Sequence, residues 1–482
     1  MAWHLQSWCT RARRFAQVQS AVRPQPKFQV EEMMKSNHLA LLLAILVVAS
    51  PLGSFAQQGA QDVPLLTLDD AVSVALSNNR LVKNSVLEAQ KYDFQVSTAR
   101  SRRLPHFQFA ALGGELLQPF DFTFAKGVFG TYPGIGPLPS TDAKVHTPAR
   151  LTAYLTGGMD IPLSQQYKIG LGIRATELGR NIAKEDVRDE RQKIAAEVRS
   201  AYFELVATQA AVEAAREGVR TLEETQRVTQ RYITEKTVLK GDALEVDARL
   251  TKAQYELSVA ENGLATQHEH LNQLLARDIA TPFRVDSVPE EDTTTLSLED
   301  ARRQASENRP EVRQAHLKEK QADYDRRIAK AEYIPDFGIA VSYMGIQNVQ
   351  VLPTNVGVAG FAMTWEPFDW GRRHNRVREK SNTLAQAHNG AQEAESQIEV
   401  EVGMKYRKWK ETALLLKATR TGHEAAAEEF RVTGNKYKEQ AALIRDLLQA
   451  QARSSETSFQ YQQALSSYWS SLADLRRAMG EE

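Results

Sequence analysis

Two short charged groups have the residue types and spacing to form ion pairs or to bind ions. Lys240 and Asp242 lie two positions apart, and Arg445 and Asp446 are adjacent. Repeated around a symmetry axis, these groups could form rings of like charge that select ions, or Arg–Asp pairs that hold an opening shut. Alternatively, the aspartates cap the helices that follow them and the other charges are solvated. The sequence leaves both interpretations open.

The run His268-Glu269-His270 contains residue types that bind metals, but its spacing does not favour a metal site. Positions two apart on a helix do not share a face, and no third ligand is nearby, so we expect a solvated helix face. The sequence contains no HExxH, GxSxG, phosphate-binding or dinucleotide-binding motif. We therefore expect no enzyme activity, no cofactor and no metal.

The overall charge does not favour a nucleic-acid partner. Lys+Arg and Asp+Glu both number 60, so the chain carries no global basic field. The 42% hydrophobic residues are enough for a sizeable core. The functional classes that remain are those of a structural, binding or transport protein.

Residues 1–56 have the layout of a secretory signal peptide. The apolar run LALLLAILVVA follows Lys35, and Ser54 and Ala56 occupy the two small positions of a cleavage site. The alternative is a buried strand or an anchor. The signal begins at Met33 or Met34, so residues 1–32 are an upstream extension. The only cysteine is Cys9, so the exported chain would have no thiol and no disulfide.

The rest of the chain reads as two copies of one plan. Between residues 66–107 and 296–337, 12 of 42 positions are identical without a gap. The pattern predicts a linker at 57–65, a first repeat at 66–276, an equatorial linker at 277–295 and a second repeat at 296–482. The copies differ at their first helix, where apolar side chains of the first copy face polar ones of the second. These pairs are Val72/Arg302, Val74/Gln304 and Leu76/Ser306.

Each copy begins with a helix and continues into two strands. A helix of about 38 residues should start at the cap Thr67 or Ser297 and stop before Pro105 or Pro335. Alternating apolar and polar residues then predict two strands of about ten residues, the length that crosses a tilted bilayer span. Between the strands of the first copy, residues 118–148 are rich in Gly, Pro and aromatics, which indicates an enlarged loop.

A long helix follows each strand pair. In the first copy it should cover about 169–232, turn near 237–242 and return over about 34 residues. Together, the returning and opening helices match the long helix and could stack end to end beside it. Its apolar positions step by 4,3,4,3, the repeat of a left-handed coiled coil. They are Ile194, Val198, Ala201, Leu205, Thr208, Val212, Ala215, Val219 and Leu222, and in the second copy Ile398, Val402, Trp409, Leu416, Ala426 and Phe430.

This doubled plan resembles the TolC-like outer membrane efflux protein family. The residues that carry the resemblance are LTLDDAVSVALSNN with LPHF, LSLEDARRQASENRPEV with IPDF, and WEPFDWGRRHNRV, over residues 66–480. Departures occur at Glu235 and Gln440, where the family often has Gly after the tip tyrosines Tyr232 and Tyr437. The first copy also lacks the Gly-Arg-Arg of 371–373.

The resemblance implies a mixed, mostly α fold with a transmembrane β-barrel. Four strands per chain would complete a 12-stranded barrel in a homotrimer, above a long coiled-coil α-helical tunnel in the periplasm. The partners implied are outer-membrane lipid, a periplasmic adaptor (membrane fusion protein) and an inner-membrane transporter. The chain would be a passive exit duct in the outer membrane, for efflux or type I secretion, with drugs, metal ions, siderophores or proteins as cargo.

The resemblance also gives roles to the candidate residues. Lys240, Asp242, Arg445 and Asp446 would surround the periplasmic aperture at the helix turns, and Trp365 and Trp370 would anchor the rim of the barrel at the membrane interface. Packing in an ordinary core is the alternative for the two tryptophans. For the whole chain, the alternative is an exported periplasmic coiled-coil scaffold or adaptor that does not insert into the membrane.

Overall fold

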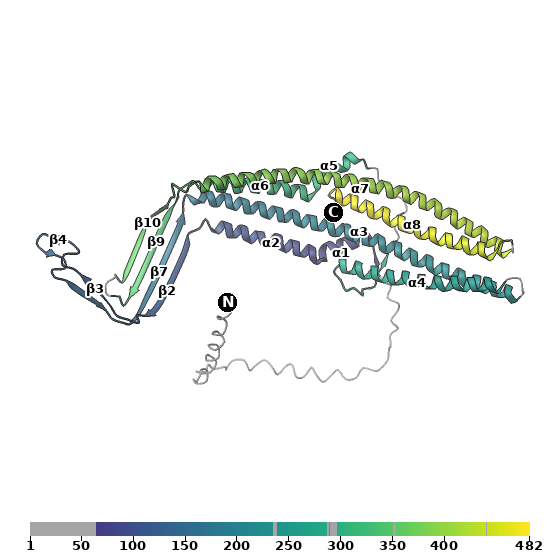
Figure 1. Ribbon diagram of the computed structural model, residues 1–482, viewed down its shortest axis with the longest axis horizontal. Helices are drawn as coiled ribbons and strands as arrows, with labels where there is room; N and C mark the ends of the chain where they lie inside the picture. Colours follow the sequence, from purple (N-terminus) through teal and green to yellow (C-terminus); the bar gives the residue numbers. More distant parts are fainter. Residues whose placement is uncertain (1–63, 235–238, 287–288, 290–295, 350–352, 440) are drawn as a thin grey trace, which may run out of the picture. The chain divides into compact units, whose positions relative to one another are not determined.

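The computed structural model describes residues 64–234, 239–286, 289, 296–349, 353–439 and 441–482. The predicted signal peptide at 1–56 lies outside these residues, as do most of the 57–65 linker and part of the 277–295 linker. The described part is mostly helical and carries one four-stranded sheet (Figure 1). Among the described residues, no helix combines the length and apolarity needed to cross a membrane.

The same order of helices and long strands occurs in both halves of the chain. The first half contains β1 (Leu65–Leu66), α1 (Leu68–Asn78), α2 (Arg80–Ser101), β2 (His106–Glu115), β7 (Leu151–Pro162), α3 (Gln165–Thr234), α4 (Lys240–Leu274) and β8 (Arg284–Val285). The second half contains α5 (Leu298–Asn308), α6 (Pro310–Ala331), β9 (Asp336–Gln347), β10 (Asn355–Thr364), α7 (Arg372–Lys438) and α8 (Ile444–Ala478). Strands β1 and β8 form a short parallel pair.

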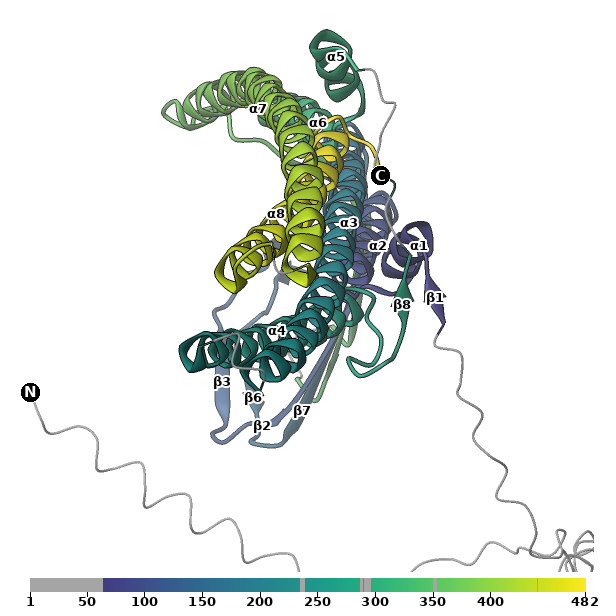
Figure 2. The same cartoon turned by 90° about the vertical axis from the view of Figure 1, so that its right-hand side faces the viewer.

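Each long helix carries two shorter helices one after the other. Helices α2 and α4 follow each other along α3, and α6 and α8 follow each other along α7 (Figure 1). Figure 2 shows α4 beside α3 and α8 beside α7 from a second direction. The 70-residue α3 is longer than the predicted 169–232. Most of the predicted heptad positions are buried, among them Ile194, Val198 and Leu205 in α3 and Val402 and Trp409 in α7.

The predicted single opening helix is wrong, because it is two helices with a break at Asn79. The backbone of Asn79 leaves the helical region (φ −54, ψ 134), and its buried side chain replaces the lost hydrogen bonds. Its Oδ1 accepts from the N–H of Leu81 at 2.8 Å, and its Nδ2 donates to the carbonyl of Leu274 at 2.9 Å. The second bond ties the break to the end of α4.

The second half breaks at the equivalent place by different chemistry. Pro310 is the first residue of α6, and a proline disfavours helical backbone at the residue before it, here Arg309. The Arg309 guanidinium is buried and donates to Glu311 Oε1 at 2.6 Å and to Glu401 Oε2 at 2.9 Å. This network attaches the break to α7.

The predicted helix starts are confirmed in detail. The hydroxyl oxygens of Thr67 and Ser297 accept from the N–H groups of Asp70 and Asp300 at 3.2 and 3.0 Å. A tyrosine of the adjoining long helix fixes the preceding residue in each half. Tyr202 donates to the carbonyl of Leu66, and Tyr406 donates to the carbonyl of Leu296, both at 3.0 Å.

The predicted difference between the two opening segments is also confirmed. Val72 is buried in a core formed with α3 and α4, whereas Arg302 at the equivalent position is exposed. Both helices bury the alanines that the repeats share, Ala71 and Ala75 in α1 and Ala301 and Ala305 in α5. The first helix therefore packs more deeply against its long neighbour.

The long strands form an antiparallel sheet in the order β10-β9-β7-β2. The halves meet at the β7–β9 pair, where Met159 lies opposite Val341. The first-half connection is not a plain loop, which corrects the prediction. It contains β3 (Phe120–Phe124) paired with β6 (Ala143–Thr147), and β4 (Thr131–Tyr132) paired with β5 (Gly136–Pro137).

The break at Asn79 yields a stability prediction. Asn79→Ala should lower the free energy of unfolding by about 2 kcal/mol, because it removes a helix cap and leaves the Leu274 carbonyl without its donor. Guanidinium unfolding followed by far-ultraviolet circular dichroism would measure the change. The control is Asn78→Ala, which replaces the exposed neighbour inside α1. Equal midpoints for both variants would show that the Asn79 side chain does not hold the break.

Candidate functional site: an apolar sheet face and the helix tips

The strand register places hydrophobic side chains on one continuous face of the sheet. Directly opposed residues in antiparallel strands share a face, and successive residues alternate. Phe107, Met159, Val341 and Ala359 are joined by successive pairings and mark this face across all four strands. The same pairings place Phe109, Leu151, Leu155, Ile161, Phe337, Ile339, Tyr343, Phe361 and Met363 on the same face.

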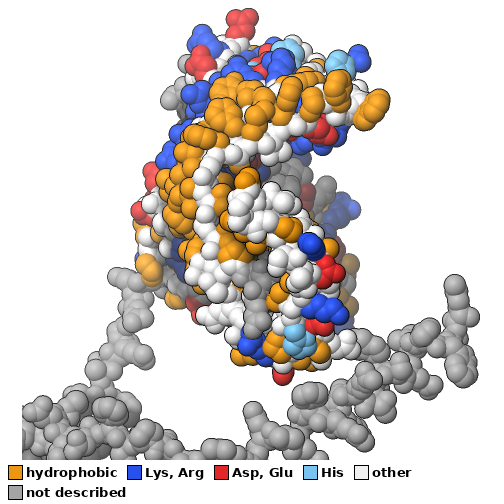
Figure 3. Space-filling model, turned by 90° about the vertical axis from the view of Figure 1, so that its left-hand side faces the viewer, with side chains coloured by type: hydrophobic (Ala, Val, Ile, Leu, Met, Phe, Trp, Pro, Cys, Tyr) orange, Lys and Arg blue, Asp and Glu red, His pale blue; other side chains and the backbone are white. Residues whose placement is uncertain are grey.

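This apolar face is open to its surroundings in the single chain. Phe361 is 86% exposed, Phe109 77%, Leu151 65% and Met363 63%. Viewed from the sheet end, hydrophobic side chains gather in a curved band along the margin of the surface (Figure 3). Contiguous apolar patches of this kind mark surfaces that contact lipid or protein.

The opposite face carries smaller and more polar residues. Its members near the helices include His106, Gln108, Asp160, Ser342 and Thr364, with glycines and alanines between them. Larger apolar side chains on this face, such as Val358, Leu112 and Ile346, lie from the middle of the strands toward the end away from the helices. An alternation of this kind separates a lipid-facing side from a polar interior.

The two outer strands leave one backbone edge each without a partner strand within the described residues. Strand β10 pairs with β9 only, and β2 pairs with β7 only. Each free edge presents a row of N–H and C=O groups that must find partners outside this chain or in water.

A short aromatic loop joins β10 to α7. Trp365, Phe368 and Trp370 are 56%, 84% and 101% exposed, so the alternative of packing in the core of the chain is wrong for both tryptophans. Positive φ angles at Trp370 (53°) and Gly371 (86°) turn the chain sharply into α7. Phe368 lies within the motif WEPFDWG but was not among the residues predicted from the sequence to form a site.

Asp369 stabilises this turn. Its carboxylate accepts from the N–H of Gly371 at 3.1 Å and from the N–H of Arg373 at 3.0 Å. The hydrogen bond from the Arg373 backbone is the main reason that the pKa of Asp369 lies below its ordinary value. The carboxylate therefore stays ionised and caps the first turn of α7.

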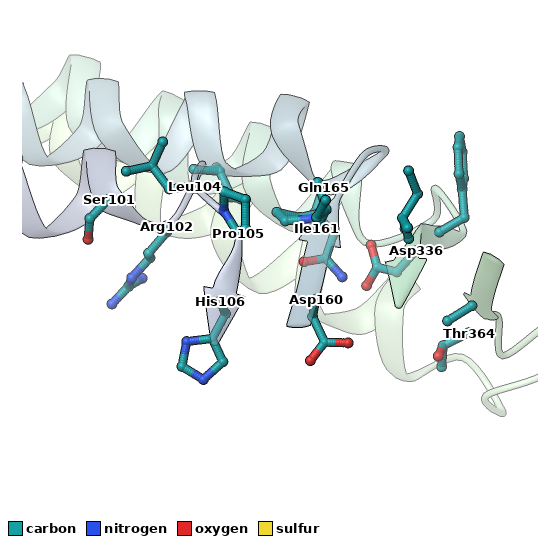
Figure 4. A pocket seen from close by; sticks show the side chains of 16 residues that line it. Ser101, Arg102, Leu104, Pro105, His106, Asp160, Ile161, Gln165, Asp336 and Thr364 are labelled. Atoms are coloured by element: carbon teal, nitrogen blue, oxygen red, sulfur yellow. The ribbon is translucent and has the colours of Figure 1, made fainter. Parts of the chain in front are cut away.

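A cavity of about 540 Å³ opens where the strands meet the helices (Figure 4). His106 and Asp160, which are cross-strand partners, point to the same side of the sheet. Lys168 Nζ lies 3.1 Å from Asp336 Oδ1 and so is already paired. The Lys168–Asp336 pair thus balances charge at the change from helix to strand.

The predicted tip residues lie at the starts of the two returning helices, and the two starts have the same geometry. The carboxylates of Asp242 and Asp446 accept from the N–H groups of Leu239 and Leu443, each at 3.4 Å. Lys240 is exposed, and Arg445 Nε lies 3.8 Å from Asp446 Oδ1, its own neighbour. Capping therefore accounts for the two aspartates, whereas Lys240 and Arg445 project as exposed cations.

An apolar cluster brings the two tips together. It combines residues of α3 and α4 with residues of α7 and α8, including Leu222, Val246 and Leu448. The rings of Tyr232 and Tyr437 meet edge to face at 6.2 Å. Burial raises the pKa of Tyr437, so its phenol is neutral at physiological pH. All four predicted tip residues therefore lie at one end of the helices.

The run His268-Glu269-His270 matches its prediction only in part. Glu269 and His270 are exposed, but His268 is half-buried with its ring 4.5 Å from that of Phe283. Burial, and then the charge of Arg277, lowers the pKa of His268, which therefore packs as a neutral side chain. Within the described residues, no group of three or more His, Cys, Asp or Glu side chains could hold a metal ion.

Comparison with known proteins gives a family match over part of the chain. Residues 301–481 match the outer membrane efflux protein family. No curated protein sequence matches the chain.

Solved structures match a larger part of the chain than the family match does. The Campylobacter jejuni CmeC outer membrane channel is 17% identical with a TM-score of 0.69, covering 86% of this chain and 85% of its own. The outer membrane protein VceC of Vibrio cholerae is 15% identical with a TM-score of 0.68, covering 86% and 96%. The Neisseria gonorrhoeae MtrE outer membrane channel is 18% identical with a TM-score of 0.66, covering 86% and 89%.

These matches confirm the resemblance expected from the sequence. The chain is similar to outer membrane efflux proteins in sequence over residues 301–481 and has the fold of outer-membrane channels over 86% of its length.

Proposed function

We propose that this protein is an outer-membrane exit duct of a tripartite efflux or type I secretion system. Three copies would form a passive channel that works with a periplasmic adaptor and an inner-membrane transporter. The outer membrane is the location supported by the family match and by the similar channels.

The observation that carries this proposal is the exposed apolar face of the four-stranded sheet. In water, such a face favours aggregation, whereas in a bilayer it is the surface that lipid requires. The strands contain 10 to 12 residues, which matches the length needed to cross the hydrocarbon layer at a tilt. The small and polar residues of the opposite face would then line an aqueous interior.

The free edges of β10 and β2 support closure by other copies. A backbone group without a partner in lipid costs several kcal/mol, so an open sheet is unstable there. Pairing β2 of one copy with β10 of the next satisfies both edges, and three copies would give 12 strands. The exposed aromatic loop with Trp365 and Trp370 would lie at the periplasmic interface, where tryptophan is favoured.

The helices would form the periplasmic tunnel. The proposed division is a signal peptide at 1–56, a linker at 57–65, repeats at 66–276 and 296–482, and an equatorial linker at 277–295. The matching helix caps and tyrosine hydrogen bonds of the two halves support an internal duplication. Two repeats in each of three chains would supply six similar helical units around the tunnel.

The helix tips would surround the periplasmic aperture. An exposed ion pair such as Arg445–Asp446 contributes at most about 1 kcal/mol, so a latch built from it would depend on threefold repetition. Lys240 and Arg445 are exposed, and in the trimer each would add three positive charges to the aperture.

The alternative of a periplasmic scaffold that stays outside the membrane explains the coiled coil but not the sheet. It would leave side chains such as Phe361 and Phe109 in water without a function. The exposed apolar face therefore favours the channel.

Fractionation and conductance test the proposal. The protein should appear in the outer membrane as an oligomer that migrates differently in gels before and after heating, and it should conduct ions in planar bilayers. A monomer released from the periplasm by salt, without conductance, would contradict the channel and support the scaffold.

The two faces of β7 offer a matched pair of substitutions. Leu155, the fifth residue of the strand, lies on the apolar face, and Thr156 lies on the opposite face. Leu155→Arg should destabilise membrane insertion by about 2–4 kcal/mol, because it places a charge toward lipid. Thr156→Arg should be tolerated, because it places the same charge toward water. Equal amounts of the two variants in the outer membrane would contradict the assignment of the faces.

The tip charges can be tested without removing the cap. Arg445→Ala combined with Asp446→Asn removes the ion pair but keeps a capping side chain. Single-channel conductance should rise about two-fold or more if the pairs narrow the aperture. The control removes the exposed Arg431–Glu428 pair of α7 by Arg431→Ala with Glu428→Gln. Unchanged conductance in the tip variant would leave capping as the role of Asp446.

A further inference from the structure

The connection between β2 and β7 is much longer than the equivalent connection in the second half of the chain. Residues 116–150 form this segment, here called the insert, and it lies beyond the end of the sheet farthest from the helices (Figure 1). The corresponding connection between β9 and β10 covers only residues 348–354. A segment this long that folds into its own strand pairs has a role beyond joining two strands.

The strand pair β3–β6 of the insert has one apolar and one polar face. Phe122 and Phe124 alternate with Asp121 and Thr123, and the pairing places Val145 opposite Phe122. The ring of Phe129 packs on Phe124 at 5.3 Å and so extends the apolar face. This face continues onto the tip of the insert.

The tip exposes apolar side chains, and the two aspartates of the insert have hydrogen-bond partners within it. Asp121 Oδ1 lies 2.6 Å from His146 Nδ1, and Asp142 Oδ1 accepts from the N–H of Lys126 at 2.8 Å. Residues 116–149 contain two lysines and two aspartates, so the formal charges balance and repulsion between identical copies is weak. The exposed apolar residues of the insert include Leu117 (90%) before β3, Phe122 (41%) in β3, and at the tip Val128 (56%), Phe129 (58%), Tyr132 (48%), Ile135 (72%) and Leu138 (42%).

Lipid is not the favoured cover for this surface. The ten residues of β2 already supply the length of one membrane crossing, so a segment beyond its outer end would lie outside the hydrocarbon layer. Exposed there, the apolar surface would contact water unless protein covers it.

The position of the insert favours a second copy of this chain as the protein that covers the apolar surface. The insert continues from β2, which is the edge strand that would pair with the next copy in the proposed trimer. We propose that the apolar surface of the insert binds the insert of a second copy of this chain, so that three inserts pack together over the outer mouth of the channel. This inference rests on the proposed function.

Cross-linking between copies tests the contact. In a Cys9→Ser background, which removes the only native thiol, Ile135→Cys on the apolar tip should be joined between copies by a short bis-maleimide in intact outer membranes. Thr123→Cys is the control, because it is exposed on the polar face of the same insert. Equal cross-linking of both, or of neither, would overturn the proposal. A fluorophore at position 135 that brominated lipid chains quench would also overturn it, in favour of a lipid-covered surface.

A shortened insert provides a second measurement. Replacing residues 125–142 by Asn-Gly joins the paired residues Phe124 and Ala143 through a two-residue turn and removes the tip. The oligomer should then dissociate in detergent at a lower temperature, while conductance persists. An unchanged dissociation temperature would overturn the contact. Absence of conductance in the unmodified chain would instead count against the channel itself.

Discussion

A sheet that is apolar on one face and that, among the residues the structure describes, has no partner strand at either edge sets the main constraint on this molecule. Neither water nor lipid satisfies such a sheet, since water disfavours the face and lipid disfavours the edges. Only association that pairs the edges, in surroundings that accept the face, meets both demands. Because β2 and β10 each have one strand neighbour within the described residues, the single chain would be an incomplete unit under the proposed function.

The helices position this sheet through contacts that the two halves share. Tyr202 and Tyr406 each attach the start of an opening helix to a long helix, at equivalent places in the two halves. The breaks at Asn79 and Arg309 also fall at equivalent places, although one uses an amide and the other a buried guanidinium. The two halves therefore share the position of the helix break but use different side chains to stabilise it.

Much of this fold was predictable because its signals are local. Heptads, caps and alternating strands depend on residues close in sequence, and the Asp242 and Asp446 caps follow from their positions at the starts of the predicted helices. The break at Asn79 was not predictable, because its hydrogen-bond partner Leu274 lies 195 positions away in the sequence. The continuous apolar face depends on the pairing between halves, such as Met159 with Val341, which no local pattern encodes. Likewise, the Gly- and Pro-rich composition of residues 118–148 indicated a loop and gave no signal for the β3–β6 pair.

The insert has a consequence for symmetry. In the proposed trimer, two similar repeats per chain would arrange the helices with approximate sixfold order around the axis. Since residues 116–150 occur in the first half alone, that order is reduced to threefold at the outer end. A molecule that approaches from outside would therefore meet three equal lobes packed around the axis. A partner that binds the outer end would meet three equivalent sites. A partner that binds the helical end would meet six nearly equivalent sites.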